Sequence, residues 1–193
     1  MSELMSAGEL DALYQRLLSQ VEGRFDALSA HFGAAMRCGA GCHSCCHPSL
    51  TVSELEARAL RALLSAEPER LERALELEAL NPHQGARCSL LDAEGRCVVY
   101  EARPLVCRSF GAPLAQLEDP TKPDERSLVV CELNFQGDEA ERLSALSADE
   151  VIDTHHTDTL LATLNVALSE ALVGERRALP RVALKASALM SVR

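Results

Sequence analysis

Cysteines are the residues of this sequence most able to do chemistry, because there are eight of them and they are clustered. Deprotonated thiols are strong ligands for zinc and iron, and a tetrahedral zinc site or an iron–sulfur cluster needs about four of them. The pattern therefore predicts zinc or iron chelation, with an iron–sulfur cluster among the options. The candidate ligands are Cys38, Cys42, Cys45, Cys46, Cys88, Cys97, Cys107 and Cys131.

The spacing within the first cluster favours ligation over simple burial. Cys42 and Cys45 are separated by two residues in a glycine-bearing loop, which lets two thiolates turn onto one ion. Adjacent side chains generally point apart, so Cys45 and Cys46 are expected to serve two neighbouring sites or different irons of a cluster. Eight cysteines match two four-thiolate sites, and one site with spare thiols fits as well.

Histidines and arginines near the cysteines are candidates for supporting roles. His43 and His47 lie inside the first cluster and could replace a thiolate, although such loop residues more often face solvent or hydrogen-bond to sulfur. Four thiolates around Zn²⁺ leave about −2 of charge, which favours nearby cations. Segment 87–108 has four arginines against three acidic residues, and Arg103 and Arg108 are the candidates to donate to sulfur.

Charge and composition narrow the class of protein. The net charge of −10, without a local basic patch, argues against binding nucleic acid or an anionic membrane surface. The sequence shows no secretory signal and no apolar run of about 18 residues, so the expectation is a cytoplasmic protein whose thiols stay reduced. No GxSxG, Walker A, GxGxxG or HExxH motif is present, which leaves the common hydrolase, nucleotide and zincin classes without support.

The remaining sequence predicts a mainly α fold, with helices packed around a small cysteine-rich metal-binding region that contains a short β-hairpin. We expect one domain over 1–193, with the metal-binding region at 38–110 and the helix 8–36 flanking it. Ser53 and Glu56 form a capping box at the start of the next helix. The other expected elements are a helix to about 64, a helix over 68–80, the hairpin 88–91 with 97–100, a surface loop over 112–126, a short strand within 127–135, a helix over 151–172 and a short helix over 181–191.

Two passages resemble one known family. The first is Cys38-Gly-Ala-Gly-Cys42-His-Ser-Cys45-Cys46, and the second runs from Cys88 through Cys97, Tyr100, Arg103-Pro104 and Cys107-Arg108. They resemble the YkgJ-like cysteine-cluster family, with its CxxCxxCC signature and its C-x(8)-C-x-x-Y-x-x-R-P-x-x-C-R pattern. The resemblance implies zinc or iron chelation by the first seven cysteines, and Cys131 fits a later cysteine of the family. His43 departs from the pattern, because a glycine is frequent there.

Three functions follow from these residues. The first is a metal-binding protein that acts through metal handling or an unknown protein partner. The second is an iron–sulfur enzyme for redox or methyl-transfer chemistry, which needs an open cluster position and a substrate pocket. The third, a thiol oxidoreductase using Cys42 and Cys45 or Cys45 and Cys46, is the weakest, because such motifs usually start a helix after a strand.

Overall fold

The computed structural model describes residues 4–80, 87–119, 121–122 and 125–191. It is mainly α-helical, as predicted, with a few short strands. The α-helices are α1 (Ala7–Phe32), α2 (Glu54–Ala66), α3 (Pro68–Leu80), α4 (Leu105–Ser109), α5 (Thr154–Val173) and α6 (Ala186–Met190). The strands are β1 (Thr51–Val52), β2 (Leu114–Leu117), β3 (Arg126–Val129), β4 (Ile152–Asp153) and β5 (Val182–Ala183).

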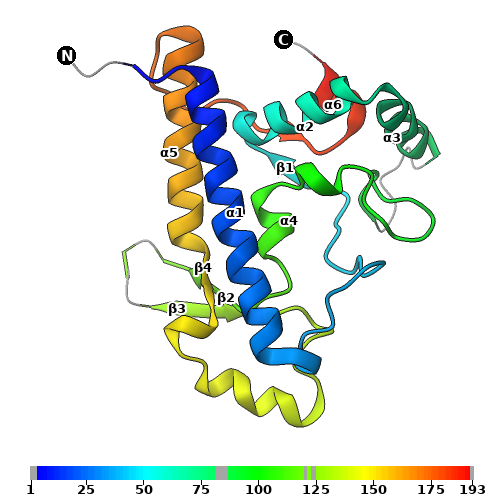
Figure 1. Cartoon of the computed structure of the whole chain (residues 1–193). Coiled ribbons are helices and arrows are strands. Elements are labelled where there is room, and N and C mark those ends of the chain that lie inside the picture. The colour runs from blue at the N-terminus through cyan, green and yellow to red at the C-terminus, as the bar shows by residue number, and fades with distance from the viewer. Residues whose placement is uncertain (1–3, 81–86, 120, 123–124, 192–193) are drawn as a thin grey trace.

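The long helices α1 and α5 run side by side in opposite directions and form the spine of the molecule (Figure 1). Apolar residues at three- and four-residue steps give α1 one buried face, as the sequence predicts. A capping box of Ser6 and Glu9 starts α1, and Gly33, with a φ of 53°, ends it. The two helices enclose the α1–α5 core, which consists of Leu10, Tyr14, Leu17, Leu18, Val21, Leu55, Leu105, Leu161 and Leu168.

Helices α2, α3 and α6 gather on one side of the spine (Figure 1). The capping box of Ser53 and Glu56 at the start of α2 is confirmed, and Asn165 of α5 accepts a further hydrogen bond from the Leu55 amide at 3.2 Å. Helix α3 has the predicted bounds. The sequence also predicts that Asn81 and Pro82 end this helix, and these two positions lie outside the described residues. These helices enclose the α2 core, which consists of Val52, Ala57, Leu60, Leu64, Ala74, Cys88, Leu90, Leu91, Val99, Leu184, Ala186 and Leu189.

A small sheet under the C-terminal end of α1 corrects two expectations. Residues 112–126 are not only a surface loop, because they contain β2, which pairs antiparallel with β3 and parallel with β4. The capping box of Ser147 and Glu150 starts a 3-10 helix, Ala148–Glu150, whereas α5 begins later and has Asp153 as its N-cap. This sheet and the end of α1 enclose the sheet core, which consists of Leu28, Phe32, Ala35, Met36, Ala112, Leu114, Phe135 and Ile152.

The predicted hairpin of the cysteine region is much reduced. One antiparallel bridge joins Leu91 to Cys97, with a turn in which the Gly95 amide donates to the Asp92 carbonyl. The Val98 amide also donates to the Leu90 carbonyl at 2.9 Å, so the chain reverses where the sequence predicts, without extended strands. Short loops of this kind leave few backbone bonds to hold the cysteines in place.

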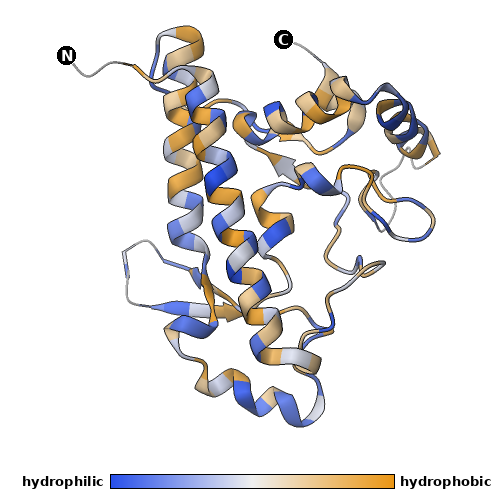
Figure 2. Ribbon diagram, in the orientation of Figure 1, coloured by the Kyte–Doolittle hydropathy of each residue, from blue (hydrophilic) through white to orange (hydrophobic). Residues whose placement is uncertain are grey.

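Hydropathy follows the same architecture. Figure 2 shows apolar and polar segments alternating along α1, as expected for a helix with one buried side. Within the described ranges, no helix combines the length and the apolar character needed to cross a bilayer.

Candidate metal centre

Four cysteines pack against one apolar core. Cys88 is buried within the α2 core, and three other cysteines lie against it while remaining half-buried. The Cys88 amide donates to the carbonyl of Cys46 at 2.8 Å, which joins the loop 37–50 to the segment 87–108. Figure 1 shows these two segments as the light-blue and green traces beside α2. We call the set the first thiol group, and it consists of Cys46, Cys88, Cys97 and Cys107.

The members of the first thiol group lie close enough to influence one another electrostatically. Burial, together with the charges of Cys97, Cys88 and Cys45, raises the pKa of Cys107 to about 12, against a lowering effect of Arg103. Burial likewise raises the pKa of Cys97 to about 11, with a contribution from Cys88. Crowded thiols of this kind resist losing several protons at once unless a cation replaces the protons.

Three further cysteines lie outside the α2 core. Burial raises the pKa of Cys38, and the charges of Cys42, Cys131 and Cys45 act in the same direction, against a hydrogen bond from Asn134. Cys131 is buried just after β3, and its carbonyl accepts a hydrogen bond from the Asn134 amide at 2.9 Å. We call Cys38, Cys42 and Cys131 the second thiol group.

The adjacent cysteines Cys45 and Cys46 affect one another strongly. Their mutual hydrogen bond raises the pKa of Cys45 and lowers that of Cys46. Cys45 also lies close enough to affect the pKa of both Cys38 and Cys107. Cys45 therefore stands between the two thiol groups, with Cys46 belonging to the first.

The cysteines are gathered, but their sulfur atoms do not form a finished coordination sphere. All eight are free thiols. Among the residues that the structure describes, no three His, Cys, Asp or Glu side chains are arranged so that they could jointly hold an ion.

Arg103 and Arg108 hold different places beside the thiols. Arg103 lowers the pKa of Cys107 and Cys97, although its side chain donates to the Tyr100 carbonyl and stacks 3.6 Å from the centre of the Tyr100 ring. Arg108 is buried, and its donors go to the Glu22 carboxylate and to the carbonyls of Arg103 and Glu101. Arg103 is thus placed to compensate thiolate charge, whereas Arg108 fastens α4, which carries Cys107, to α1.

The other predicted polar residues of this region bind one another. The Nδ1 atom of His43 lies 2.9 Å from the Gly41 carbonyl, and its Nε2 atom lies 3.1 Å from Arg87. Arg96 forms ion pairs with Asp92 and Glu94 and is exposed. His47 is exposed, so the structure gives it no evident part in a site.

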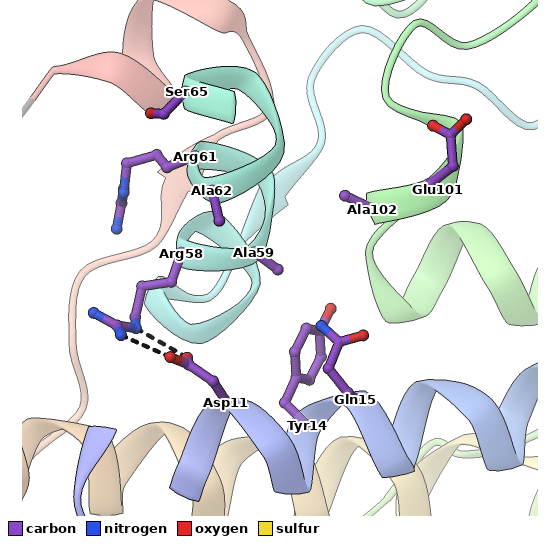
Figure 3. A pocket seen from close by; sticks show the side chains of 10 residues that line it. All are labelled: Asp11, Tyr14, Gln15, Arg58, Ala59, Arg61, Ala62, Ser65, Glu101 and Ala102. Carbon is purple, nitrogen blue, oxygen red and sulfur yellow. Dashed lines mark hydrogen bonds and ion pairs between the residues drawn. The ribbon is translucent and has the colours of Figure 1, made fainter. Parts of the chain in front are cut away.

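A cavity lies beside the spine of the molecule. It has a volume of about 460 Å³, and Figure 3 shows it between α1, α2 and the turn at Glu101 and Ala102. Arg58 and Asp11 form an ion pair at its edge, and the buried Tyr14 hydroxyl has no hydrogen-bond partner. None of its lining residues is a cysteine, and they are Asp11, Tyr14, Gln15, Arg58, Ala59, Arg61, Ala62, Ser65, Glu101 and Ala102.

Several residues of the site escaped the sequence reasoning. Asn134 binds the Cys38 sulfur, and Glu56 accepts a hydrogen bond from the Leu105 amide at the start of α4. Glu22 binds Arg108 from α1. The capping box identified Glu56 as a helix-start residue, but no local pattern marks Asn134 or Glu22, because their partners are remote in sequence.

Comparison with known proteins gives a family match for the cysteine-rich part of the chain. No curated protein and no solved structure matches the chain. A protein-family model does match residues 37–129, a range that includes seven of the eight cysteines and leaves out Cys131. The model is that of the CxxCxxCC family, described as a putative zinc- or iron-chelating domain, to which this segment is similar.

Proposed function

We propose that this protein chelates zinc or iron through its clustered cysteines, with the first thiol group as the main site. The observation that carries the proposal is the convergence of all four members on the α2 core from two separate segments. Each of these segments falls within the range of the family match. Four thiols in one place correspond to the ligand number of a tetrahedral zinc site or of a cluster.

The chain supplies the conditions that a thiolate site needs. The raised pKa of Cys97 and of Cys107 means that these ligands hold their protons at neutral pH until a metal displaces them. Arg103 opposes part of that rise and offsets negative charge on the sulfurs. The apolar α2 core excludes water from one side, which strengthens every charge interaction within the group.

A bound zinc or iron would act here as a crosslink between two weakly structured segments. Loop 37–50 contains turns and little regular structure, and segment 87–100 is held by a single β-bridge. Because the binding energy of a structural metal is also folding energy, we expect the metal-free protein to be less stable in this region. The α1–α5 core contains no cysteine, and we expect its helices to remain folded.

Of the two chemical roles, we propose chelation, which the four thiols on the α2 core support. An iron–sulfur enzyme needs a substrate cavity that opens onto the cluster, and the cavity lining contains no cysteine. The metal would accordingly have a structural role or be handled by the protein. The zinc, iron and sulfide contents distinguish a zinc site from an iron–sulfur cluster.

Metal analysis of the purified protein tests the proposal. The protein would be purified without oxygen, and zinc, iron and acid-labile sulfide would be measured per chain together with a visible spectrum. We expect bound metal in the wild type and its loss in Cys88→Ser/Cys107→Ser. Val98→Ala, which trims a side chain packed on the same core, serves as the control and should keep its metal.

Single substitutions in the first cluster extend the test. We expect Cys42→Ser and Cys45→Ser each to lower the metal content and the stability of the protein. Wild-type protein without zinc or iron, even after reconstitution with either metal, would contradict the proposed function. Unchanged metal content in every cysteine variant would contradict the assignment of these ligands.

A further inference from the structure

The cavity between α1, α2 and the turn Tyr100–Ala102 contains a polar group whose hydrogen bond is unmet. Tyr14 is only 1% exposed, and within the described residues its hydroxyl has no hydrogen-bond partner. Figure 3 shows its side chain rising from α1 with the hydroxyl directed into the space between Ala59 and Ala102. A buried hydroxyl without a partner is costly and calls for an explanation. The other such hydroxyl, that of Ser169, does not line this cavity.

The dimensions and walls of the cavity suit a small organic molecule. Its volume of about 460 Å³ falls in the range of about 300–1,000 Å³ that such sites usually have. Ala59, Ala62 and Ala102 line it, and their short side chains present methyl groups from α2 and from the turn before α4. An apolar body can therefore pack between these alanines, while most of the other lining residues offer polar groups.

The polar groups around this space leave donors available, whereas the carboxylates are already paired. Both oxygens of the Asp11 carboxylate accept from Arg58, from Nε at 3.0 Å and from Nη2 at 2.7 Å. The Glu101 carboxylate accepts from Arg70. Within the described part of the chain, the Nη1 group of Arg58 and the side-chain amide of Gln15 have no hydrogen-bond partner. A ligand that supplies acceptors would satisfy these donors.

The charges of the lining residues favour a monoanion over a dianion. Asp11 and Glu101 are acidic, and Arg58 and Arg61 are basic, so the charges balance and a dianionic phosphate would lack compensation. A carboxylate carries a single charge, and its two oxygens match the planar edge of a guanidinium group. Arg58 uses one edge for Asp11 and keeps another for such a partner.

The outer and inner ends of the cavity differ in character. The Arg58 and Arg61 side chains, which are 30% and 23% exposed, belong to the outer end, whereas the buried Tyr14 forms the inner end. Burial raises the pKa of Tyr14, so its hydroxyl stays protonated at neutral pH and can donate a hydrogen bond. A ligand that spans the cavity therefore needs a carboxylate at one end and a neutral acceptor at the other.

From these observations we propose that the cavity binds a small organic monocarboxylate. The carboxylate pairs with the free edge of Arg58, the apolar body packs between the alanines, and a hydroxyl or carbonyl oxygen of the ligand accepts from Tyr14. The inference goes beyond the proposed function and does not depend on it, because no lining residue is a cysteine. The turn that bounds the cavity continues through Pro104 into α4, so the ligand would lie beside the segment that supplies Cys107.

NMR titration of the reduced, isotope-labelled full chain tests this site. Two probes, 4-hydroxybenzoate and 6-hydroxyhexanoate, carry a carboxylate and a hydroxyl at opposite ends of an apolar body, and 4-hydroxybenzamide lacks the charge. At least one carboxylate should shift the amide resonances of the lining residues and bind with a Kd of about 1 mM or tighter, which a ligand of this size can reach. The benzamide should bind about tenfold more weakly, because the charge-assisted pair with Arg58 is lost.

Tyr14→Phe isolates the contribution of the unpartnered hydroxyl. The substitution removes an oxygen that has no partner in the ligand-free protein, so it should not lower the unfolding free energy. It should weaken the binding of a hydroxylated probe by about three- to tenfold and leave unchanged that of its counterpart without the hydroxyl, benzoate or hexanoate. Tyr100→Phe is the matched control, since Tyr100 is the other tyrosine of the chain and does not line the cavity.

Ala62→Leu fills the space itself. Ala62 is exposed on α2 and leucine is a good helix former, so this variant should stay folded, as circular dichroism would verify, and lose the probe. Ala66→Leu, on the same helix but outside the lining, should bind as the wild type does. The inference would be overturned by any one of three results: no shift of the lining residues with either carboxylate up to about 10 mM, equal affinities for carboxylate and benzamide, or unchanged binding of the hydroxylated probe in Tyr14→Phe or Ala62→Leu.

Discussion

The guanidinium group of Arg108 lies 2.7 Å from the carboxylate of Glu22, although 86 residues separate them in the sequence. Only 7% of the Arg108 side chain is exposed, whereas 44% of the Glu22 side chain is. Arg108 also donates to the carbonyls of Arg103 and Glu101, which closes the turn before α4. One residue thus joins the helix that carries Cys107 to the middle of α1.

Replacing Arg108 by alanine should destabilise the protein by about 2–4 kcal/mol, because a buried cation and its hydrogen bonds to two carbonyls and a carboxylate are lost together. Urea denaturation followed by circular dichroism measures the change. Arg96→Ala is the matched control, since Arg96 belongs to the same segment and is exposed, and it should change little. Similar effects of the two substitutions would contradict the role assigned to Arg108.

Glu56 links the start of α2 to the start of α4. Its carboxylate accepts hydrogen bonds from the Ser53 amide at 2.7 Å and from the Leu105 amide at 3.1 Å, and it is buried. Glu56→Gln replaces one acceptor oxygen by a donor and leaves one of these amides unsatisfied, so we expect a loss of about 1–3 kcal/mol in unfolding free energy.

The control for Glu56 is the equivalent residue of α1. Glu9 forms the same capping box with Ser6, but it is exposed and binds no second helix. Glu9→Gln should therefore have a much smaller effect in the same denaturation experiment. Equal effects would show that the capping box, rather than the link to Leu105, accounts for the contribution of Glu56.

Gly111 should not tolerate a side chain. Its φ of 113° is unfavourable for other residues, and a Cβ atom would overlap the Cys38 sulfur. Gly111→Ala should lower the unfolding free energy by about 1–3 kcal/mol. Gly39→Ala, at a position with open space and without a positive φ, should be tolerated. Thermal unfolding of both variants measures the difference. A melting temperature of Gly111→Ala equal to that of the wild type would contradict the close approach of Gly111 to the Cys38 sulfur.

Glu150 should make a pH-dependent contribution at the C-terminal end of α1. Hydrogen bonds from the Ser147 amide, from His31 at 2.9 Å and from the Ser147 hydroxyl lower the pKa of this carboxyl from 4.5 to about 2. A carboxylate with a lowered pKa stabilises the folded state above its ordinary pKa, and the effect disappears as the pH falls toward 2.

The stability difference between the wild type and Glu150→Gln should therefore be present at pH 6 and shrink between about pH 4.5 and pH 2. Chemical denaturation at each pH measures it, and NMR titration of the Glu150 carboxyl gives the pKa directly. A constant difference over this range, or a carboxyl that titrates near 4.5, would be inconsistent with the bonds to Ser147 and His31.

Local sequence determined much of the helical framework. The periodic apolar residues of α1, the capping box at Ser53 and the bounds of α3 depend on interactions between residues three or four positions apart. The cysteine spacing likewise predicted a chelating region, which the family match over 37–129 supports. These features could be read from the sequence because each is a short-range physical relationship.

Long-range packing decided the rest. Strand β2 pairs with β3 and β4, and β4 lies more than 30 residues later in the sequence, so no local pattern revealed β2 inside the expected loop. Cys46, Cys88, Cys97 and Cys107 come together because they pack on the α2 core, which no spacing in the sequence reveals. Asn134 reaches Cys38 across 96 residues of sequence, and the hydrogen bond from the Phe135 amide to Ala35 fixes the neighbouring turn just beyond α1. Contacts of this kind depend on the three-dimensional path of the chain, which only the tertiary structure decided.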